Sequence, residues 1–161
     1  MKQIIRGILN GLAYIHRQGY VHGDIKTMNI LMADADDFSK IKIIDFGICQ
    51  KVKKRTLLEK RWGTLMYIAP EIIKKEGYGP VVDIWSTAII LYKLCMMGKH
   101  PFLENAEGKK EILQILGSKE LPKQDETLPC PLAQDLFEKM TIQNQFDRIN
   151  ARKALAHPFL E

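Results

Sequence analysis

Cysteine is scarce in this sequence of 161 residues: there are three, at positions 49, 95 and 130, and no Cys-x-x-Cys pair. An odd number of widely spaced thiols argues against a disulfide framework or a zinc site and indicates a reducing compartment. Long apolar runs are also missing. The longest covers residues 84–97 and is interrupted by Lys93, whereas a membrane span needs about 20 apolar residues. Residues 1–6 carry no apolar run of signal-peptide length. We therefore expect an intracellular, cytoplasmic protein with no membrane partner.

Positive charge is concentrated in one segment and is not spread over the chain. The net charge is +5, and residues 51–61 alone carry six basic residues against Glu59: Lys51, Lys53, Lys54, Arg55, Lys60 and Arg61. One basic loop suits a phosphate group or an acidic partner better than it suits a duplex. A solvated, flexible loop remains the open alternative. We expect no nucleic-acid partner.

The remaining composition is that of a globular domain, 46% hydrophobic and 27% charged, and the length suits one domain. Apolar residues at helical spacing predict an amphipathic helix over residues 2–18, and five more helices are expected at 71–75, 83–97, 106–116, 131–140 and 150–156. Short extended segments are expected at 20–22 and 30–32, with a strand over 41–44. Residues 46–68 show little periodicity and predict a long irregular segment. The predicted fold class is mostly α with a small β ribbon.

Two short motifs carry the chemistry of the chain. His22-Gly23-Asp24-Ile25-Lys26-Thr27-Met28-Asn29 is followed after sixteen residues by Asp45-Phe46-Gly47. Together they supply a carboxylate that can accept a proton, an ammonium that can meet a phosphate, and two oxygen ligands for a metal ion. Phosphoryl transfer needs these parts and little covalent help from the protein. Any one of these polar residues alone would more often cap a turn, but all four in this order indicate phosphoryl transfer.

Gly63-Thr64 and Ala69-Pro70-Glu71 follow downstream. With them, the chain resembles the C-terminal lobe of a eukaryotic Ser/Thr protein kinase over nearly all of its 161 residues. The resemblance implies that residues 1–161 form the C-lobe portion of a kinase catalytic domain, with an activation segment from about 45 to 71. It also implies ATP and Mg²⁺ as cofactors and a protein serine or threonine hydroxyl as the acceptor.

The resemblance assigns roles to the residues of the two motifs. Asp24 is expected to be the catalytic base, and Lys26 is expected to place its charge near the transferred phosphoryl group and the nucleotide. Asn29 and Asp45 are the expected magnesium ligands. Leu31 is expected to line the floor of the adenine pocket, with Ile90 and Leu94 beneath it; plain core packing of these three residues is compatible with that role.

Other residues are expected to shape the site. Thr64 should bond the catalytic Asp24 and Lys26, and it favours Ser/Thr acceptors over tyrosine. His22 is expected to be a packing residue with Phe46 beneath it, held through its backbone by Asp83. Glu71 and Arg148 match a buried ion pair of the family. The remaining histidines, His16, His100 and His157, are expected at helix ends or on the surface.

The chain departs from the family pattern at Gly23, where most members carry an arginine that pairs with a phosphorylated activation-segment residue. Thr56 is the obvious acceptor in the basic loop. We expect that phosphorylation of Thr56 does not switch this protein by the usual pairing, although Lys53, Lys54 and Arg55 could bind the phosphate locally. A Thr56→Glu variant with many-fold higher activity would contradict this.

The sequence contains no Gly-x-Gly-x-x-Gly and no strand lysine paired with a helix glutamate. We therefore expect the N-terminal lobe to be absent, so that ATP meets one wall of its site and the isolated lobe has very low activity. Leu31 would then face water and call for the missing lobe or a partner that covers the nucleotide face. The alternative interpretation is a non-catalytic kinase-like interaction module or a truncated kinase fragment.

Overall fold

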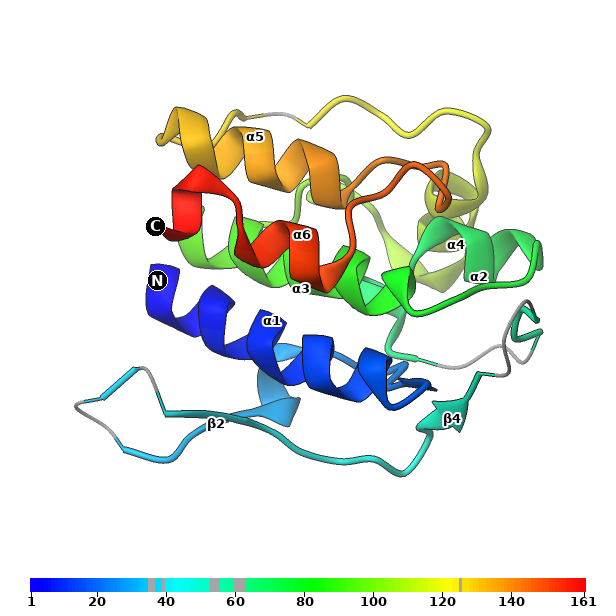
Figure 1. Cartoon of the computed structure of the whole chain (residues 1–161). Coiled ribbons are helices and arrows are strands. Elements are labelled where there is room, and N and C mark those ends of the chain that lie inside the picture. Colours follow the sequence, from blue (N-terminus) through cyan, green and yellow to red (C-terminus); the bar gives the residue numbers. More distant parts are fainter. Residues whose placement is uncertain (35–36, 39, 53–55, 60–62, 125) are drawn as a thin grey trace.

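The amphipathic helix α1 (Lys2–Arg17) lies between a helical layer and a small β ribbon in this computed structural model (Figure 1). The structure describes residues 1–34, 37–38, 40–52, 56–59, 63–124 and 126–161. The inner face of α1 is made of buried aliphatic residues at helical spacing: Ile5, Ile8, Leu9, Leu12 and Ile15. The sequence therefore predicts this helix within one residue.

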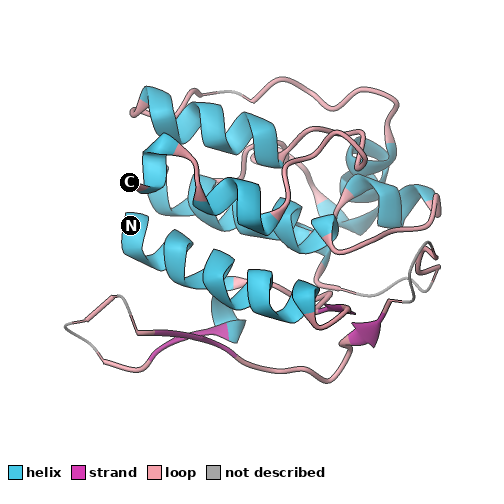
Figure 2. Ribbon diagram, in the orientation of Figure 1, coloured by secondary structure: helices cyan, strands magenta, loops and turns pink. Residues whose placement is uncertain are grey.

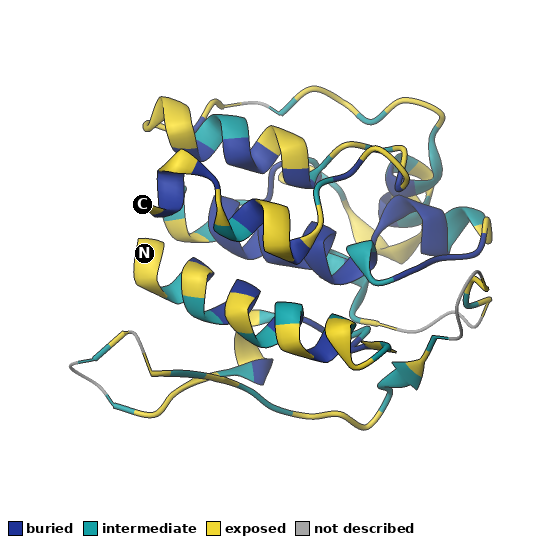
Figure 3. Ribbon diagram, viewed as in Figure 1, coloured by how far each residue is buried: buried dark blue, intermediate teal, exposed yellow. Residues whose placement is uncertain are grey.

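Helix α3 (Val81–Cys95) is the centre of the fold, because every residue from Val82 to Tyr92 is buried. It packs against α1 on one side and α5 (Pro131–Met140) on the other. The short helix α6 (Ala151–Leu155) closes the layer by packing on α1. Figure 3 shows the buried residues of these helices facing one another.

A second apolar cluster surrounds Trp85 of α3. It is covered by α2 (Pro70–Lys74) and α4 (Gly108–Gly117), which contact each other. This cluster takes in Ile68, Ala69 and Ile72, so the chain that leads into α2 is fixed to the core.

The described residues contain two antiparallel strand pairs (Figure 2) and an isolated bridge between Leu58 and Tyr78. Strand β2 (Ile30–Met32) pairs with β3 (Ile41–Ile43), with Ile30 opposite Ile43 and Met32 opposite Ile41. Strand β1 (Tyr20–Val21) pairs with β4 (Gln50–Lys51). Single 3₁₀ turns lie at Thr27–Asn29, Leu65–Tyr67 and Pro158–Leu160.

The β2–β3 ribbon rests on α1 at two glycines. A Cβ atom on Gly7 would lie 2.7 Å from both Cβ and Cγ1 of Ile41, and one on Gly11 would lie 2.8 Å from Cδ1 of Ile43. Real Cβ atoms are not found this close to other heavy atoms. The absence of side chains at these two positions therefore allows the ribbon to lie directly against the helix backbone.

The predicted fold class, mostly α with a small β ribbon, is confirmed. The prediction of an irregular segment over residues 46–68 is wrong in part, because it contains β4 and the turn Leu65–Tyr67. The expected surface or helix-end position is wrong for His100, which is buried outside any helix end; His157 is also buried but caps the turn Pro158–Leu160. Within the described part of the chain, no helix combines the length and the apolar character needed to span a membrane.

Candidate active site

The turn at His22–Asp24 is held by one buried carboxylate. The Oδ2 atom of Asp83 accepts a hydrogen bond from the backbone N–H of His22 (3.0 Å), and Oδ1 accepts one from that of Gly23 (2.8 Å). His16 Nε2 lies 2.8 Å from the same Oδ2 atom. Because Asp83 lies in the first turn of the buried central helix, the loop between residues 22 and 24 is fixed to the core.

The imidazole of His22 is fully engaged in structural contacts. Its Nδ1 atom accepts from the backbone N–H of Asp24 (3.2 Å), so Nε2 carries the proton and donates to the carbonyl oxygen of Ile44 (3.0 Å). The ring of Phe46 meets it edge-on at 5.1 Å between centroids. His22 therefore links the segment that carries Asp24 to the segment that carries Asp45, with no ring nitrogen left for catalysis.

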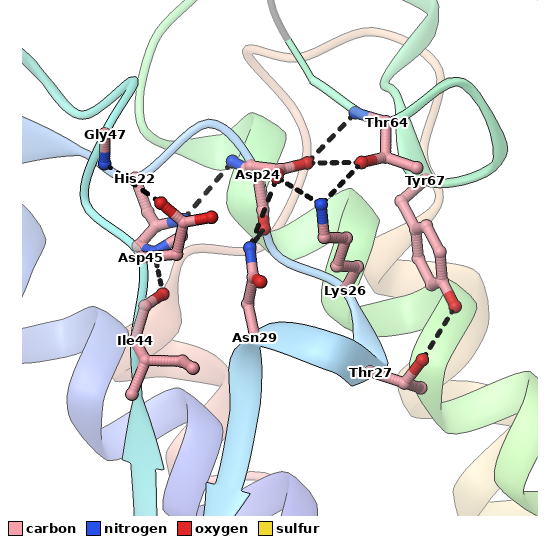
Figure 4. A network of polar contacts seen from close by, with 10 residues as sticks. All are labelled: His22, Asp24, Lys26, Thr27, Asn29, Ile44, Asp45, Gly47, Thr64 and Tyr67. Atoms are coloured by element: carbon pink, nitrogen blue, oxygen red, sulfur yellow. Dashed lines mark hydrogen bonds and ion pairs between the residues drawn. The ribbon is translucent and has the colours of Figure 1, made fainter.

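The carboxylate of Asp24 is the centre of a polar network (Figure 4). Its Oδ1 atom accepts from Thr64 twice, from Oγ1 at 2.6 Å and from the backbone N–H at 3.0 Å. Its Oδ2 atom accepts from Lys26 Nζ at 2.6 Å and from Asn29 Nδ2 at 3.2 Å. Lys26 Nζ also donates to Thr64 Oγ1 at 3.1 Å, so these residues form a closed cluster.

The network determines the protonation state of Asp24. Partial burial alone would raise the pKa of this carboxyl group, but the hydrogen bonds from Lys26 and Thr64 and the positive charge of Lys26 outweigh it, with a further contribution from Asn29. The pKa of Asp24 is therefore below its ordinary value. The group is an anion that orients donors around it.

Asn29 and Asp45 come together through the ribbon. The backbone N–H of Ile44 donates to the carbonyl oxygen of Asn29 (3.0 Å), so the two chains are in register where β2 begins and β3 ends. The side-chain amide of Asn29 donates to Asp24, which leaves its Oδ1 atom as a possible ligand. Figure 4 shows the Asp45 carboxylate directed toward the side of the network where Asn29 and Asp24 lie.

This donor set suits a hard divalent cation. Amide and carboxylate oxygens are the ligands that magnesium accepts, and it needs few of them because it keeps part of its water. Asp45 is exposed and has a positive φ of 62°, and its Oδ1 atom accepts from the backbone N–H of Gly47 at 3.3 Å. The carboxylate is thereby oriented at the surface, where a cation and its water can reach it.

Comparison with known proteins gives the family of the chain. The model of the protein kinase domain matches residues 1–160. The chain belongs to the protein kinase family. Calcium-dependent protein kinase 27 of Arabidopsis thaliana is 36% identical to it over 162 residues, which cover 98% of this chain and 32% of the relative. The chain thus spans about a third of the length of this curated kinase.

The segment that leads into α2 of this kinase chain is fixed by two residues outside the motifs. His100 Nε2 donates to the carbonyl oxygen of Met66 (2.9 Å), and Ser86 Oγ donates to that of Tyr67 (2.8 Å). Burial lowers the pKa of His100 to about 4, more than its bond to Met66 raises it. The neutral ring therefore acts as a structural donor to the backbone two residues after Thr64.

The ion pair between Glu71 and Arg148 is fully inside the kinase domain. Two parallel contacts, at 2.6 and 2.9 Å, join the guanidinium to the carboxylate, and the two side chains are 0% and 2% exposed for Arg148 and Glu71 respectively. Arg148 also lies over the Trp85 ring at 5.1 Å and donates to the carbonyl oxygens of Ile142 and of Val81 at the start of α3. This pair connects the end of the segment 45–71 to the last helices.

Some apolar side chains of the ribbon and of the segment that follows it are half exposed. Leu31 is 49% exposed and Phe46 is 50% exposed. Of the two residues expected beneath Leu31, Ile90 is buried in the main core, but Leu94 is exposed. The expectation of a buried layer under Leu31 is therefore wrong for Leu94. The main packing partner of the ribbon is α1, through β3.

Three long-range contacts around the site could not be predicted from the sequence. His16 contacts Asp83, which is 67 positions away, and His100 contacts Met66, which is 34 positions away. The hydroxyl group of Tyr67 lies 3.1 Å from Thr27 Oγ1, which is 40 positions away. No local pattern indicates such pairs. Thr56 is exposed, whereas Lys53, Lys54, Arg55, Lys60 and Arg61 lie outside the described residues.

Proposed function

We propose that residues 1–161 are the C-terminal lobe of a Ser/Thr protein kinase catalytic domain, with an activation segment from about 45 to 71. The proposed reaction is transfer of the ATP γ-phosphoryl group to serine or threonine hydroxyls of a protein substrate. The observation that supports it most is the closed network of Asp24, Lys26, Asn29 and Thr64. It places a carboxylate, an ammonium and a hydroxyl within hydrogen-bond distance of one another.

Asp24 would serve as the base of this reaction. Its lowered pKa keeps it ionised, so it would orient the acceptor hydroxyl and take its proton as the phosphoryl group arrives. A positioned general base typically contributes about 10²–10⁴-fold to a rate. Thr64 holds one carboxylate oxygen with two bonds, which fixes the plane of the carboxylate toward the acceptor.

Lys26 would place its ammonium beside the transferred group, since its Nζ atom is already at the Asp24 carboxylate. Asn29 and Asp45 would hold magnesium, which supplies neutralisation of the charge on the nucleotide phosphates when bound. Leu31 would contact the base of the nucleotide. Its exposure supports the view that an N-terminal lobe or a partner covers this face in the active protein.

A second candidate is a non-catalytic kinase-like module, or a fragment of a kinase whose activity belongs to the whole protein. Gly23 favours this candidate, because glycine replaces the arginine that would read a phosphorylated activation segment. Gly23 has a φ of +80°, and Ile48 is the nearest neighbour of a Cβ built there, at 3.7 Å. A side chain at this position would therefore have space, but its left-handed backbone conformation would be strained.

Thermal unfolding with millimolar Mg–ATP separates the two candidates. The proposed kinase site predicts stabilisation that Asp45→Ala abolishes and that Asp34→Ala retains, because Asp34 carries the same charge at the far end of the ribbon. No shift in the unmodified chain would favour the interaction module. An equal loss in both variants would show that the nucleotide responds to ribbon charge and not to a site at Asp45.

A further inference from the structure

A groove of about 810 Å³ lies away from the proposed catalytic residues. Its walls are Ala13, His16 and Arg17 of α1, Pro80 and Val81 at the start of α3, and residues 150–152 at the start of α6. Figure 1 shows the C-terminal end of α1 and the N-terminal ends of α3 and α6 on the same side of the helical layer. Three elements that are distant in sequence therefore form one concave surface.

The groove combines an apolar floor with a cationic rim. Alanine, proline and valine side chains supply the apolar surface, and Arg17 and Arg152 are exposed at the rim. No aspartate or glutamate is among the residues that line it. Within the described ranges, neither arginine forms an ion pair; Arg17 lies over the Tyr14 ring at 5.4 Å. The two guanidinium groups are thus available to an anionic ligand.

We propose that this groove docks an acidic peptide segment, in which an apolar side chain fills the floor and flanking carboxylates meet Arg17 and Arg152. Arginine forms bidentate bonds with carboxylates. Because the surface is concave and only as wide as three helix ends, it fits an extended chain better than a flat lipid surface. The complementary charge also speeds encounter with an acidic partner.

Two successive hydrogen bonds connect the groove to the backbone of the loop that carries Asp24. His16 lines it and bonds Asp83, and Asp83 holds the N–H groups of His22 and Gly23. An occupant that restricts His16 also restricts Asp83. Docking therefore stabilises the turn before Asp24, and the effect is measurable without any phosphoryl transfer.

Fluorescence anisotropy with a labelled peptide of glutamates around two leucines tests the binding. The unmodified chain should bind it, and the same peptide with glutamine in place of each glutamate should bind far more weakly. Each of Arg17→Ala and Arg152→Ala should weaken binding by about fivefold, the upper range for an exposed ion pair. Arg6→Ala is the matched control, because Arg6 is an exposed arginine of α1 outside the groove; it should leave the affinity unchanged.

Hydrogen exchange locates the bound peptide. Saturating peptide should slow exchange of the amides of His22 and Gly23 by about twofold or more, since these depend on Asp83. The proposal is overturned if Arg6→Ala weakens binding as much as the groove variants, or if the glutamine peptide binds equally well. It is also overturned if the acidic peptide does not bind the unmodified chain, and binding of phosphatidylserine vesicles in its place would assign the groove to a lipid surface.

Discussion

Replacing Gly7 with alanine tests how the ribbon that carries the candidate metal ligands is seated. Two effects of opposite sign compete at this position. Alanine in a helix interior is more stable than glycine by about 1 kcal/mol. Against this, the new methyl group would lie 2.7 Å from Cβ and Cγ1 of Ile41, whereas carbon atoms in contact are normally about 3.5–4.0 Å apart.

The clash outweighs the gain in helix propensity at Gly7. The Cβ atom of Ile41 is attached to the strand backbone, so the ribbon itself must move by about 1 Å to restore normal contact. Overpacking of this kind costs about 1–3 kcal/mol. We therefore expect Gly7→Ala to lower the free energy of unfolding by about 1 kcal/mol, a fall in Tm of about 2–4 °C.

Compared with Gly7, the same substitution at Gly11 is expected to cause a weaker clash. A Cβ atom there would meet Cδ1 of Ile43 at 2.8 Å, and this terminal methyl can rotate away. We expect Gly11→Ala to be neutral within about 0.5 kcal/mol, because side-chain adjustment offsets the gain in propensity. Asn10→Ala, at an exposed position of the same helix, should stabilise by about 0.5 kcal/mol because no clash opposes it.

Urea unfolding followed by circular dichroism gives these differences directly. In the same preparations, Gly7→Ala should also reduce the Mg–ATP stabilisation, because displacement of β3 moves Asp45 relative to Asn29. If Gly7→Ala stabilises the chain as Asn10→Ala does, the close contact between α1 and β3 is not a constraint on the ribbon. If stability falls but the Mg–ATP shift is unchanged, the ribbon does not position the metal ligands.

The remaining predictions concern the buried polar groups. Arg148→Met should destabilise the chain by about 3–5 kcal/mol in urea, because Glu71 is left buried without its partner. The double variant with Glu71→Met should recover much of the lost free energy of unfolding. If Arg148→Met alone costs under about 1 kcal/mol, the reasoning is refuted. For His100, the folded pKa of about 4 lies below the ordinary 6.5, so the unfolded chain binds more protons between these values. Stability should therefore fall as the pH is lowered from 6.5 to 4, by up to about 3 kcal/mol. His100→Asn should flatten this part of the curve, and an unchanged slope would show that other groups cause it. Asn150→Ala should cost about 1 kcal/mol, because the Asn150 side chain caps α6 by accepting from the backbone N–H of Lys153 at 2.9 Å; equal stability of the variant would contradict this role.

Elements with their own periodicity could be predicted from sequence. The apolar stripe of residues 2–18 and the proline-bounded segment 131–140 agree with α1 and α5 within one residue. Helix α3 was expected at 83–97 and lies at Val81–Cys95, because Pro80 can occupy the N-cap and the helix starts directly after it. Strand β4 was missed, since a two-residue strand has no period and is defined by its partner β1.

The candidate site also has a part that could be predicted from the sequence and a part that could not. Asp24, Lys26 and Asn29 lie within six residues, so their chemistry can be inferred from the local sequence. The family comparison agrees with the kinase resemblance. The sequence alone thus determined the kind of side chains available and the helices that carry them, because both depend on short-range spacing. The kinase resemblance also led us to expect the contact of Thr64 with Asp24 and Lys26. Only the tertiary structure decided that His16 and His100 anchor the site and that Gly7 and Gly11 seat the ribbon. Each of these depends on contacts between distant residues, and such contacts are fixed by the packing of the whole chain.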